Sequence, residues 1–413
     1  MASKSRLGER IGKRIGKRFE EMFDEESFDS FDYDPEVPEA FEEPEAFDYD
    51  PEVPEAFEEP EVDEENEFQY CLEEARATGC ESFSCLGKTF YRIFDYEEYS
   101  NILAKAEGER EKFFHRERRE RILKEFSDKD YLPQVCFDSE SLKAARTKFP
   151  NLVNVIDHLE DEVAFSAIGN HPLTLSQPLL LLGPSGCGKT QLLQDVFRGR
   201  FCYMFDCASA NAGWGLTGSE PLWHKAHPGI VAKTFLNSGV CNYCLILDEL
   251  DKARGDDRYS IQNAMTQLLE VESAKHFRDL YLEFEMDASR LNIVATANYE
   301  DPIERHILDR FMVVECREPD LNEREVIIRS IYLELLKARQ LTTVFSKKLP
   351  PAVLDRLVQS RVSIRKVKGI LQKLMARTLR CKKEAKGQKL MLSAELLDDL
   401  MPEEQTRKRI GFI

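Results

Sequence analysis

The sequence predicts an α/β fold in which a mainly parallel sheet is covered by helices, preceded by a long disordered segment. From about residue 142, short apolar runs typical of strands alternate with segments of helical periodicity, as in βα units. Residues 20–67 differ sharply, because they contain 24 acidic side chains, no Lys or Arg, and many prolines. Such a composition opposes a packed core, so this segment is predicted to be disordered.

The length and charge of the chain limit its class. Its 413 residues allow roughly two to three folded units of about 150 residues each. The formal net charge is −19, but residues 1–19 carry +6 and residues 20–67 carry −24, which leaves −1 for residues 68–413. The presumed folded body therefore has no global basic field, and nucleic acid is not expected as a partner.

Several features favour a cytoplasmic protein with no transmembrane segment. Apolar runs such as residues 178–182 are far shorter than the roughly 18 to 20 residues of a membrane-spanning helix. The basic N-terminus is not followed by the apolar region of a secretory signal. The 11 cysteines, an odd number scattered along the chain, are typical of reduced thiols.

The chain before residue 135 contains three predicted segments. Residues 1–19 place apolar side chains every four positions among basic ones, which predicts a basic amphipathic helix that contacts anionic lipid or the acidic segment; a frayed, solvated tail is the alternative. Residues 20–67 repeat F-D-Y-D-P-E-V-P-E-A-F-E-E-P-E with a period of 16, and this repeat could dock a partner or act as a spacer. Residues 68–134 regain mixed charge and are predicted to form a helical extension.

A phosphate-binding loop is predicted between a strand at residues 179–182 and a helix at residues 191–197. The intervening text, G-P-S-G-C-G-K-T, matches G-x-x-x-x-G-K-[ST] in its required strand-loop-helix setting. In such a loop the backbone N–H groups wrap around phosphates, Lys189 would contact the β- and γ-phosphates, and Thr190 would ligate Mg²⁺. The predicted nucleotide contacts are Gly183, Pro184, Ser185, Gly186, Cys187, Gly188, Lys189 and Thr190.

Two further apolar runs end in polar side chains. Residues 244–247 lead into Asp248 and Glu249, and the carboxyl end of a strand in an open parallel sheet exposes residues to ligand. Asp248 would hold Mg²⁺, directly or through water, and Glu249 would polarise the attacking water. A third strand, at residues 293–297, ends at Asn298, whose amide could orient the same water.

Arg310 is predicted to act between subunits. It follows a short amphipathic segment at residues 303–308, twelve residues after Asn298. A guanidinium inserted into the active site of an adjacent subunit would stabilise the charge that spreads in the transition state. A surface ion pair is the competing interpretation for Arg310, and Arg305 is the second candidate for the role between subunits.

The order and spacing of these motifs resemble those of an AAA+ ATPase. Over residues 145–380 the chain is similar to the ATPase module of Lon proteases and of its protease-free bacterial relatives. The text that carries this resemblance is L-D-E-L-D-K at 247–252, L-L-E-V-E at 268–272, F-R-D-L-Y-L at 277–282, A-T-A-N at 295–298 and I-L-D-R-F at 307–311. The resemblance implies a large α/β ATPase domain at residues 135–318, followed at residues 319–413 by a helical lid and a tail.

The resemblance also implies roles for single residues. Asn298 looks like sensor 1, Arg310 like the arginine finger, and Arg365 like the sensor-2 arginine, with Arg361 as its fallback. Trp223 precedes a Pro-Gly pair, where the family has an aromatic residue that grips polypeptide in a central pore; packing against its own domain is the alternative. The implied cofactors are ATP and Mg²⁺, and the implied assembly is a homo-oligomeric ring, a hexamer.

ATP hydrolysis coupled to remodelling or unfolding of a protein substrate is the function that the resemblance implies. A Lon peptidase domain with its Ser-Lys pair would follow the lid, but the sequence ends at Ile413, so proteolysis by this polypeptide is not expected. Two alternatives stay open. Asp248 and Glu249 argue against a scaffold that binds ATP without turnover, and the neutral body argues against a DNA-directed motor.

Two cysteine positions suggest further chemistry. Cys241-x-x-Cys244 has the spacing of half a zinc site, but a single such pair favours the interpretation that these are core cysteines. Cys187, within the phosphate loop, could make ATP binding sensitive to oxidation, although a variable position of the motif is the favoured interpretation.

Overall fold

The computed structural model describes most of the chain from residue 64 onward. The described ranges are 64–108, 116–135, 139–168, 175–197, 201–210, 212–253, 260–360, 362–381 and 389–401. The predicted basic helix at 1–19 and nearly all of the predicted disordered segment at 20–67 lie outside them. The chain forms two compact units, Met1–Phe90 and Tyr91–Ile413. Among the described helices, none combines the length and apolar character that a bilayer span requires.

In the first unit, a helix and a hairpin turn bring three phenylalanines together. The elements are α2 (Glu64–Thr78), β1 (Ser82–Cys85) and the start of β2 (Lys88–Arg92). The turn uses Leu86 and Gly87, whose φ angles of 51° and 73° are both left-handed, as in a type I′ hairpin turn. The ring centroid of Phe90 lies 5.0 Å from that of Phe68 in α2 and 5.1 Å from that of Phe83.

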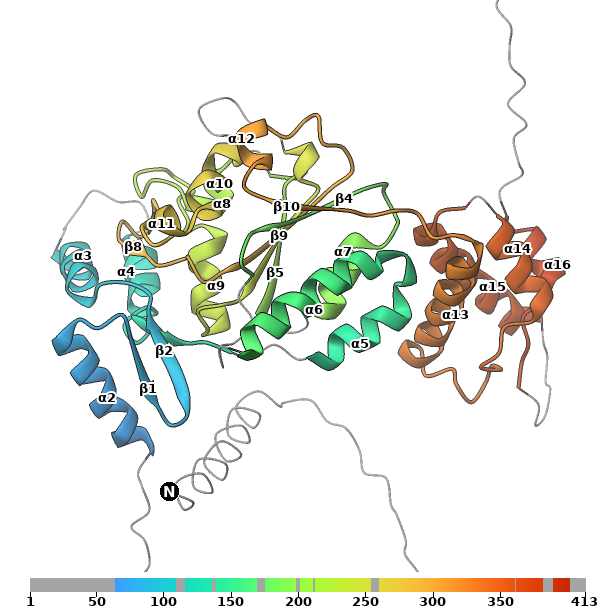
Figure 1. Ribbon diagram of the computed structural model, residues 1–413, viewed down its shortest axis with the longest axis horizontal. Coiled ribbons are helices and arrows are strands. Elements are labelled where there is room, and N and C mark those ends of the chain that lie inside the picture. Colours follow the sequence, from blue (N-terminus) through green and yellow to red (C-terminus); the bar gives the residue numbers. More distant parts are fainter. Residues whose placement is uncertain are drawn as a thin grey trace, which may run out of the picture. The chain divides into compact units, whose positions relative to one another are not determined.

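The second unit contains a five-stranded parallel sheet (Figure 1). In spatial order the strands are β10 (Met312–Glu315), β4 (Leu179–Leu182), β9 (Asn292–Ala297), β6 (Cys244–Asp248) and β5 (Cys202–Asp206). Every neighbouring pair runs parallel, so the carboxyl ends of all five strands meet at one edge. Because β4, β9 and β6 are neighbours, the residues that follow them lie close together at the edge where such sheets bind ligands.

Helices cover both faces of the sheet. Leu179 and Leu181 pack with helices α5, α6 and α7, whereas Leu180 packs with α9 and α10, because successive strand residues point to opposite faces. The bounds are α5 (Ser139–Lys148), α6 (Val153–Ile168), α7 (Lys189–Val196), α9 (Ile230–Ser238) and α10 (Ile261–Leu269). The predicted parallel sheet flanked by helices is confirmed.

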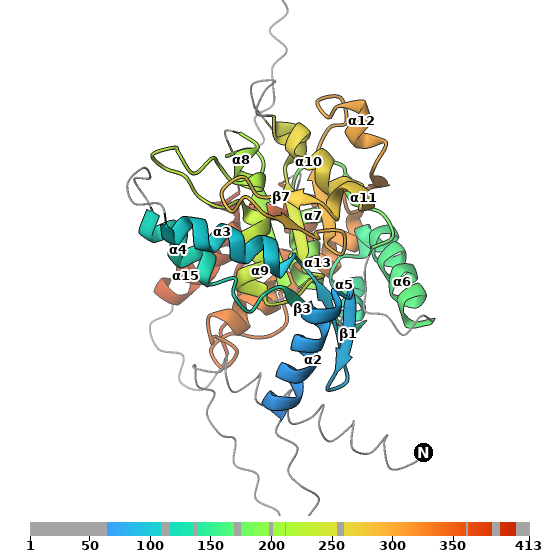
Figure 2. The ribbon, with the colours of Figure 1, turned by 90° about the vertical axis from the view of Figure 1, so that its left-hand side faces the viewer.

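Shorter elements join these strands and helices. They are η1 (Pro150–Leu152), α8 (Trp214–Thr217), η3 (Leu250–Lys252), α11 (Val271–Ala274), β7 (Phe277–Arg278), β8 (Glu285–Met286) and α12 (Arg305–Leu308). Three more precede the sheet: α3 (Tyr96–Gly108), α4 (Arg116–Lys124) and β3 (Tyr131–Pro133). Figure 2 shows α3 beside α4. Tyr99 and Phe126 pack edge-on against Phe284, between β7 and β8, which ties these helices to the β7–β8 hairpin.

The C-terminal helices form a group with a core of its own (Figure 1). They are α13 (Leu321–Ala338), α14 (Pro351–Gln359), α15 (Ile364–Cys381) and α16 (Ala394–Asp398). A capping box begins α13: the Asp320 side chain accepts from the Glu323 N–H at 2.8 Å, and the Glu323 side chain accepts from the Asp320 N–H at 2.9 Å. Tyr332, Phe345 and Leu371 are buried at the centre of this group.

Candidate functional site

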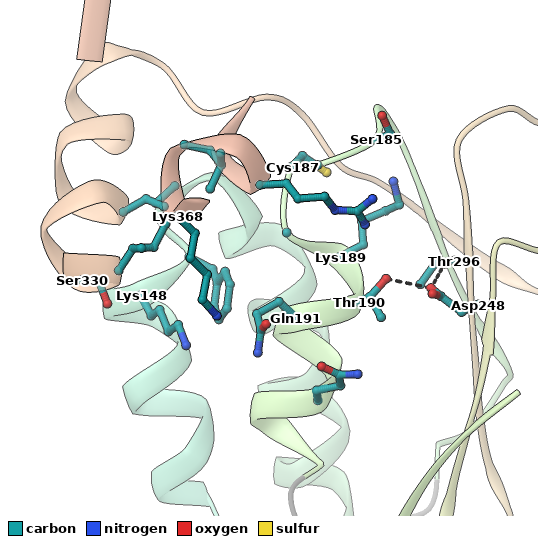
Figure 3. A pocket seen from close by; sticks show the side chains of 18 of the residues that line it. Lys148, Ser185, Cys187, Lys189, Thr190, Gln191, Asp248, Thr296, Ser330 and Lys368 are labelled. Carbon is teal, nitrogen blue, oxygen red and sulfur yellow. Dashed lines mark hydrogen bonds between the residues drawn. The ribbon is translucent and has the colours of Figure 1, made fainter. Parts of the chain in front are cut away.

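A cavity of about 380 Å³ lies beside the loop that follows β4 (Figure 3). Its walls come from this loop and the start of α7, from the polar residues at the ends of β6 and β9, and from α13 and α15. The cavity brings together ten residues that the sequence singled out: Ser185, Gly186, Cys187, Gly188, Lys189, Thr190, Asp248, Glu249, Asn298 and Arg365. Gly183 and Pro184 begin the same loop.

The loop after β4 needs glycine where its backbone is crowded or left-handed. A Cβ atom at Gly183 would lie 2.1 Å from the carbonyl oxygen of Cys316. Gly186 and Gly188 have φ angles of 83° and 110°, which residues with a Cβ rarely adopt. Helix α7 begins directly after Gly188, and the N–H groups and dipole of a helix N-terminus favour an anion there.

Lys189 joins this loop to the end of β9. Its Nζ donates to the carbonyl oxygens of Gly183 at 2.6 Å and Pro184 at 3.0 Å, and to Asn298 Oδ1 at 3.2 Å. The side chain lines the cavity although the residue is only 7% exposed. An ammonium shielded from bulk water attracts phosphate more strongly than an exposed one does.

Two hydroxyl groups converge on the carboxylate of Asp248 at the end of β6 (Figure 3). Thr190 Oγ1 donates to Asp248 Oδ1 at 2.7 Å, and Thr296 Oγ1 donates to the same oxygen at 2.6 Å. A hydroxyl and a carboxylate so close together are hard oxygen donors, which fit Mg²⁺. Sequence reasoning missed Thr296, although its position two residues before Asn298 on one strand was an available signal.

Glu249 follows β6 in a left-handed conformation, with φ 55° and ψ 50°. Its backbone N–H donates to Thr296 Oγ1 at 3.1 Å, which fixes the turn. Its carboxylate lies 2.7 Å from Lys252 Nζ and lines the cavity. A carboxylate in this place can accept a proton from a water molecule in the cavity.

Helices α13 and α15 supply the wall opposite the phosphate loop. From α15 come Ile364, Arg365 and Lys368, so two cations and an apolar side chain face the loop. The loop and α15 also approach each other directly, since a Cβ atom at Gly186 would lie 3.8 Å from the Cβ of Ser363. Arg361, the fallback for Arg365, lies outside the described residues.

Sequence reasoning missed Lys148, which lines the cavity, and Asn151, which bonds the phosphate loop. Lys148 Nζ pairs with Asp195 of α7 at 2.5 Å and also with Glu334 of α13. Burial lowers the pKa of Lys148, but the hydrogen bonds to both carboxylates outweigh burial and raise that pKa above its usual value. Asn151 Nδ2 donates to the carbonyl oxygen of Cys187 at 3.0 Å, which ties η1 to the phosphate loop. Neither residue has a motif to mark it.

Arg310 and Trp223 lie outside the set of described residues that line the cavity. Arg310 donates from Nε to Glu270 Oε1 at 2.8 Å, and it also bonds the carbonyl oxygen of His306. Its side chain is 26% exposed, so this chain holds it in a surface ion pair. Trp223 is 39% exposed and packs edge-on against Trp214, with 5.2 Å between the ring centroids.

The cysteines that suggested further chemistry are buried. Cys241 and Cys244 both lie in the core, and burial raises the pKa of Cys241 to about 12. Burial also raises the pKa of Cys187, whose thiol lies in the cavity wall. Within the part of the chain that the structure describes, no group of three or more His, Cys, Asp or Glu side chains could hold a metal ion.

Comparisons with known proteins agree with this geometry. Residues 179–318 match the family described as ATPase family associated with various cellular activities (AAA). Lon protease of Mycoplasmopsis agalactiae is 30% identical over 163 residues, and Lon protease of Ureaplasma parvum is 28% identical over 205 residues. These stretches cover 39% and 49% of this chain, but only 16% and 26% of those proteins.

Among solved structures, a chain of the S. cerevisiae Hsp104:casein complex is similar over 59% of this chain and 47% of that chain, with 15% identity and a TM-score of 0.48. The resemblance to AAA+ ATPases of the Lon branch, predicted from motifs alone, is confirmed by the family match and the Lon relatives. Residues 179–318 of this chain therefore form an ATPase domain of the AAA family, with the parallel, helix-flanked sheet of the AAA+ P-loop fold.

Proposed function

We propose that this protein hydrolyses Mg²⁺-ATP at interfaces between subunits of a homo-oligomeric ring and uses the energy to remodel or unfold a protein substrate. The observation that carries the proposal is the meeting of Lys189, Thr190, Asp248 and Glu249 in one cavity at the edge of a parallel sheet. Phosphoryl transfer needs charge neutralisation and in-line positioning, and this set supplies a cation, a metal-binding oxygen pair and a base.

Each side chain has a distinct part in the proposed reaction. Lys189 and the loop N–H groups bind the phosphates, while Thr190 and Asp248 hold Mg²⁺. When bound, Mg²⁺ would neutralise negative charge on the phosphates. Glu249 accepts a proton from the attacking water, and Asn298, whose amide oxygen lies beside Lys189, orients that water.

Two arginines are proposed to complete the site. Arg365 of α15 lines the cavity and binds phosphate from the lid side. Arg310 extends from the surface and enters the cavity of a neighbouring subunit, where it stabilises the transition state. Its partly exposed side chain and its place outside the cavity of its own chain support this role.

The proposed substrate is a polypeptide, and the proposed contact to it is Trp223 in the central pore of the ring. The exposure of Trp223, and of Leu222 beside it at 70%, supports this part of the proposal. We further propose that residues 135–318 form the large ATPase domain and residues 319–413 the lid and tail, in a cytoplasmic protein whose residues 68–134 are an extension.

The variant Glu249→Gln tests the proposed chemistry. Because it removes the base but not the phosphate contacts, it should bind ATP and release phosphate about 10²-fold more slowly or worse. Phosphate release and binding of a fluorescent ATP analogue measure the two properties. The control is Glu272→Gln, an exposed carboxylate paired with Lys275 at 2.9 Å, which should retain full turnover.

Two results would count against the proposal. Unchanged turnover in Glu249→Gln would remove Glu249 from the mechanism. Negligible ATPase activity of the wild type at every protein concentration would instead favour a scaffold that binds nucleotide without turnover.

A further inference from the structure

We infer that Thr296 is a positioning residue of the proposed ATPase reaction. Its hydroxyl holds the carboxylate of Asp248, the proposed Mg²⁺ ligand, and the backbone of Glu249, the proposed base, in one arrangement. The inference rests on the proposed function and assigns a role to a residue that the A-T-A-N motif contains but to which the sequence analysis gave none. Thr296 lines the cavity but is only 2% exposed, and its hydroxyl bonds Asp248 and Glu249, so we place it as a residue that acts through these neighbours.

The hydrogen bonds of Thr296 have a fixed direction. The Glu249 N–H can only donate, so Thr296 Oγ1 accepts from it, at 3.1 Å. The single hydroxyl proton of Thr296 is then directed to Asp248 Oδ1, at 2.6 Å. One oxygen atom therefore links the side chain of Asp248 to the backbone of Glu249.

Strand pairing explains why Thr296 can reach both residues. Strands β6 and β9 pair in parallel up to Leu247 and Ala295, so Thr296 stands one residue further, beside Asp248. Val294 packs with the α7 side of the sheet, and Thr296, two residues later, points to the same face. The phosphate loop lies on this face, so the Thr296 hydroxyl is on the same side of the sheet as the cavity.

The backbone of Glu249 needs such support. A left-handed φ of 55° at a residue with a Cβ is sterically unfavourable and persists where surrounding contacts hold it. The bond to Thr296 holds this N–H, and the turn aims the Glu249 carboxylate along the cavity wall. Loss of the hydroxyl would leave this partly buried N–H without its partner and let the turn relax.

Thr190 does not replace Thr296 in this role. Both hydroxyls donate to Asp248 Oδ1, but Thr190 is the one that the phosphate-loop motif assigns to Mg²⁺. When Thr190 serves as a metal ligand, Thr296 keeps Asp248 in place. Removal of a group that orients a metal ligand usually costs about 10- to 100-fold in activity or metal affinity.

The test compares Thr296→Val, which keeps the shape and removes the hydroxyl, with Thr296→Ser, which keeps the hydroxyl. Thr296→Ala serves as a second hydroxyl-free variant if valine disturbs folding. The matched control is Thr378→Val, because Thr378 is also 2% exposed but bonds only the Leu374 carbonyl oxygen of its own helix, at 2.9 Å. Turnover, the Mg²⁺ concentration for half-maximal turnover, nucleotide binding in EDTA and the thermal unfolding midpoint are measured for each.

The inference predicts that Thr296→Val and Thr296→Ala lose about 10- to 100-fold in kcat and need more Mg²⁺, while nucleotide binding in EDTA stays at the wild-type level. Thr296→Ser and Thr378→Val should keep wild-type turnover and Mg²⁺ dependence. Wild-type kcat and Mg²⁺ dependence in both hydroxyl-free variants would overturn the inference alone, and so would a serine variant as slow as valine. A wild type that hydrolyses no ATP would overturn the proposed function and this inference together.

Discussion

Lys189 supplies a positive charge to the proposed phosphate position. It bonds two carbonyl oxygens of its own loop and Asn298 across the sheet edge. A charged hydrogen bond contributes about 1.5–3 kcal/mol, so Lys189→Ala should weaken ATP binding about 10- to 150-fold. Titration of a fluorescent ATP analogue measures the affinity. Lys275→Ala, which removes an exposed ammonium paired with Glu272, should bind like the wild type; equal binding by the Lys189 variant would remove Lys189 from the site.

Single residues could be predicted from the sequence where a local motif defines them. Lys189 and Asp248 belong to such motifs, because each follows directly from a strand and its adjoining loop or carboxylate pair. The contacts of Thr296 and Lys148 could not be found this way. These contacts reach Asp248 and Glu334 across the fold, and only the pairing of β6 with β9 and the packing of α5 near α13 bring these atoms together.

At the scale of elements, substitution of two glycines by alanine distinguishes the effect of steric crowding from the effect of backbone entropy. Gly183 has the Cys316 carbonyl oxygen where a Cβ would stand, at 2.1 Å, whereas a Cβ at Gly369 in α15 would meet nothing within 4 Å. Gly183→Ala should therefore destabilise the fold by about 1–3 kcal/mol, the usual cost of overpacking. Gly369→Ala should stabilise it by about 0.5–1 kcal/mol, because alanine loses less entropy in a helix.

Urea unfolding of both variants measures these changes in free energy. The two changes in unfolding free energy are predicted to have opposite signs. A Gly183→Ala variant as stable as the wild type would contradict the close approach of the Cys316 carbonyl oxygen, just after β10, to Gly183.

Asp279 ties the start of α9 to the β7–β8 hairpin. Its Oδ2 accepts from the Gly229 N–H at 2.7 Å, and its Oδ1 accepts from the N–H groups of Tyr281 at 2.9 Å and Leu282 at 3.1 Å. Burial raises the pKa of Asp279 to about 7, although these three N–H groups lower it. The carboxyl is thus a pH-dependent contact between two elements.

The pH dependence of stability follows from this raised pKa. An unfolded Asp loses its proton near about pH 3.9, so between that pH and about 7 the folded state holds the extra proton. The stability that this group contributes is therefore full below about pH 4 and is lost as the pH rises through about 7. Asp279→Asn should show a smaller fall in unfolding free energy between about pH 4 and 7 than the wild type. Equal slopes in urea unfolding would contradict this.

The elements themselves were predictable in proportion to their length and apolar character. The runs at β4, β6 and β9 are bounded by motif residues and were predicted as strands. The two-residue strands β7 and β8 were missed, because so short a pair has no periodicity. The spatial order β10-β4-β9-β6-β5 could not be derived either, since it depends on which crossovers pack best over the sheet.

For the whole molecule, the proposed reaction depends on more than one chain. Each chain supplies a cavity with Glu249, but holds Arg310 in a surface ion pair with Glu270. The motif order predicted Arg310 as a residue between subunits, yet no pattern within one chain encodes how a second copy approaches. Residues 68–413 carry a net charge of only −1. Because so small a net charge does not select a partner, local surfaces must determine which partner binds.

Mixing two inactive variants tests the shared site most directly. Arg310→Ala keeps Glu249 in its own cavity, and Glu249→Gln keeps an intact Arg310, so each should be nearly inactive alone. Where the two subunits meet in a mixed ring, one interface has both groups, and phosphate release should reappear and peak at intermediate ratios. A mixture as inactive as its components, although the two variants co-assemble, or wild-type turnover by Arg310→Ala alone, would contradict an active site shared between subunits.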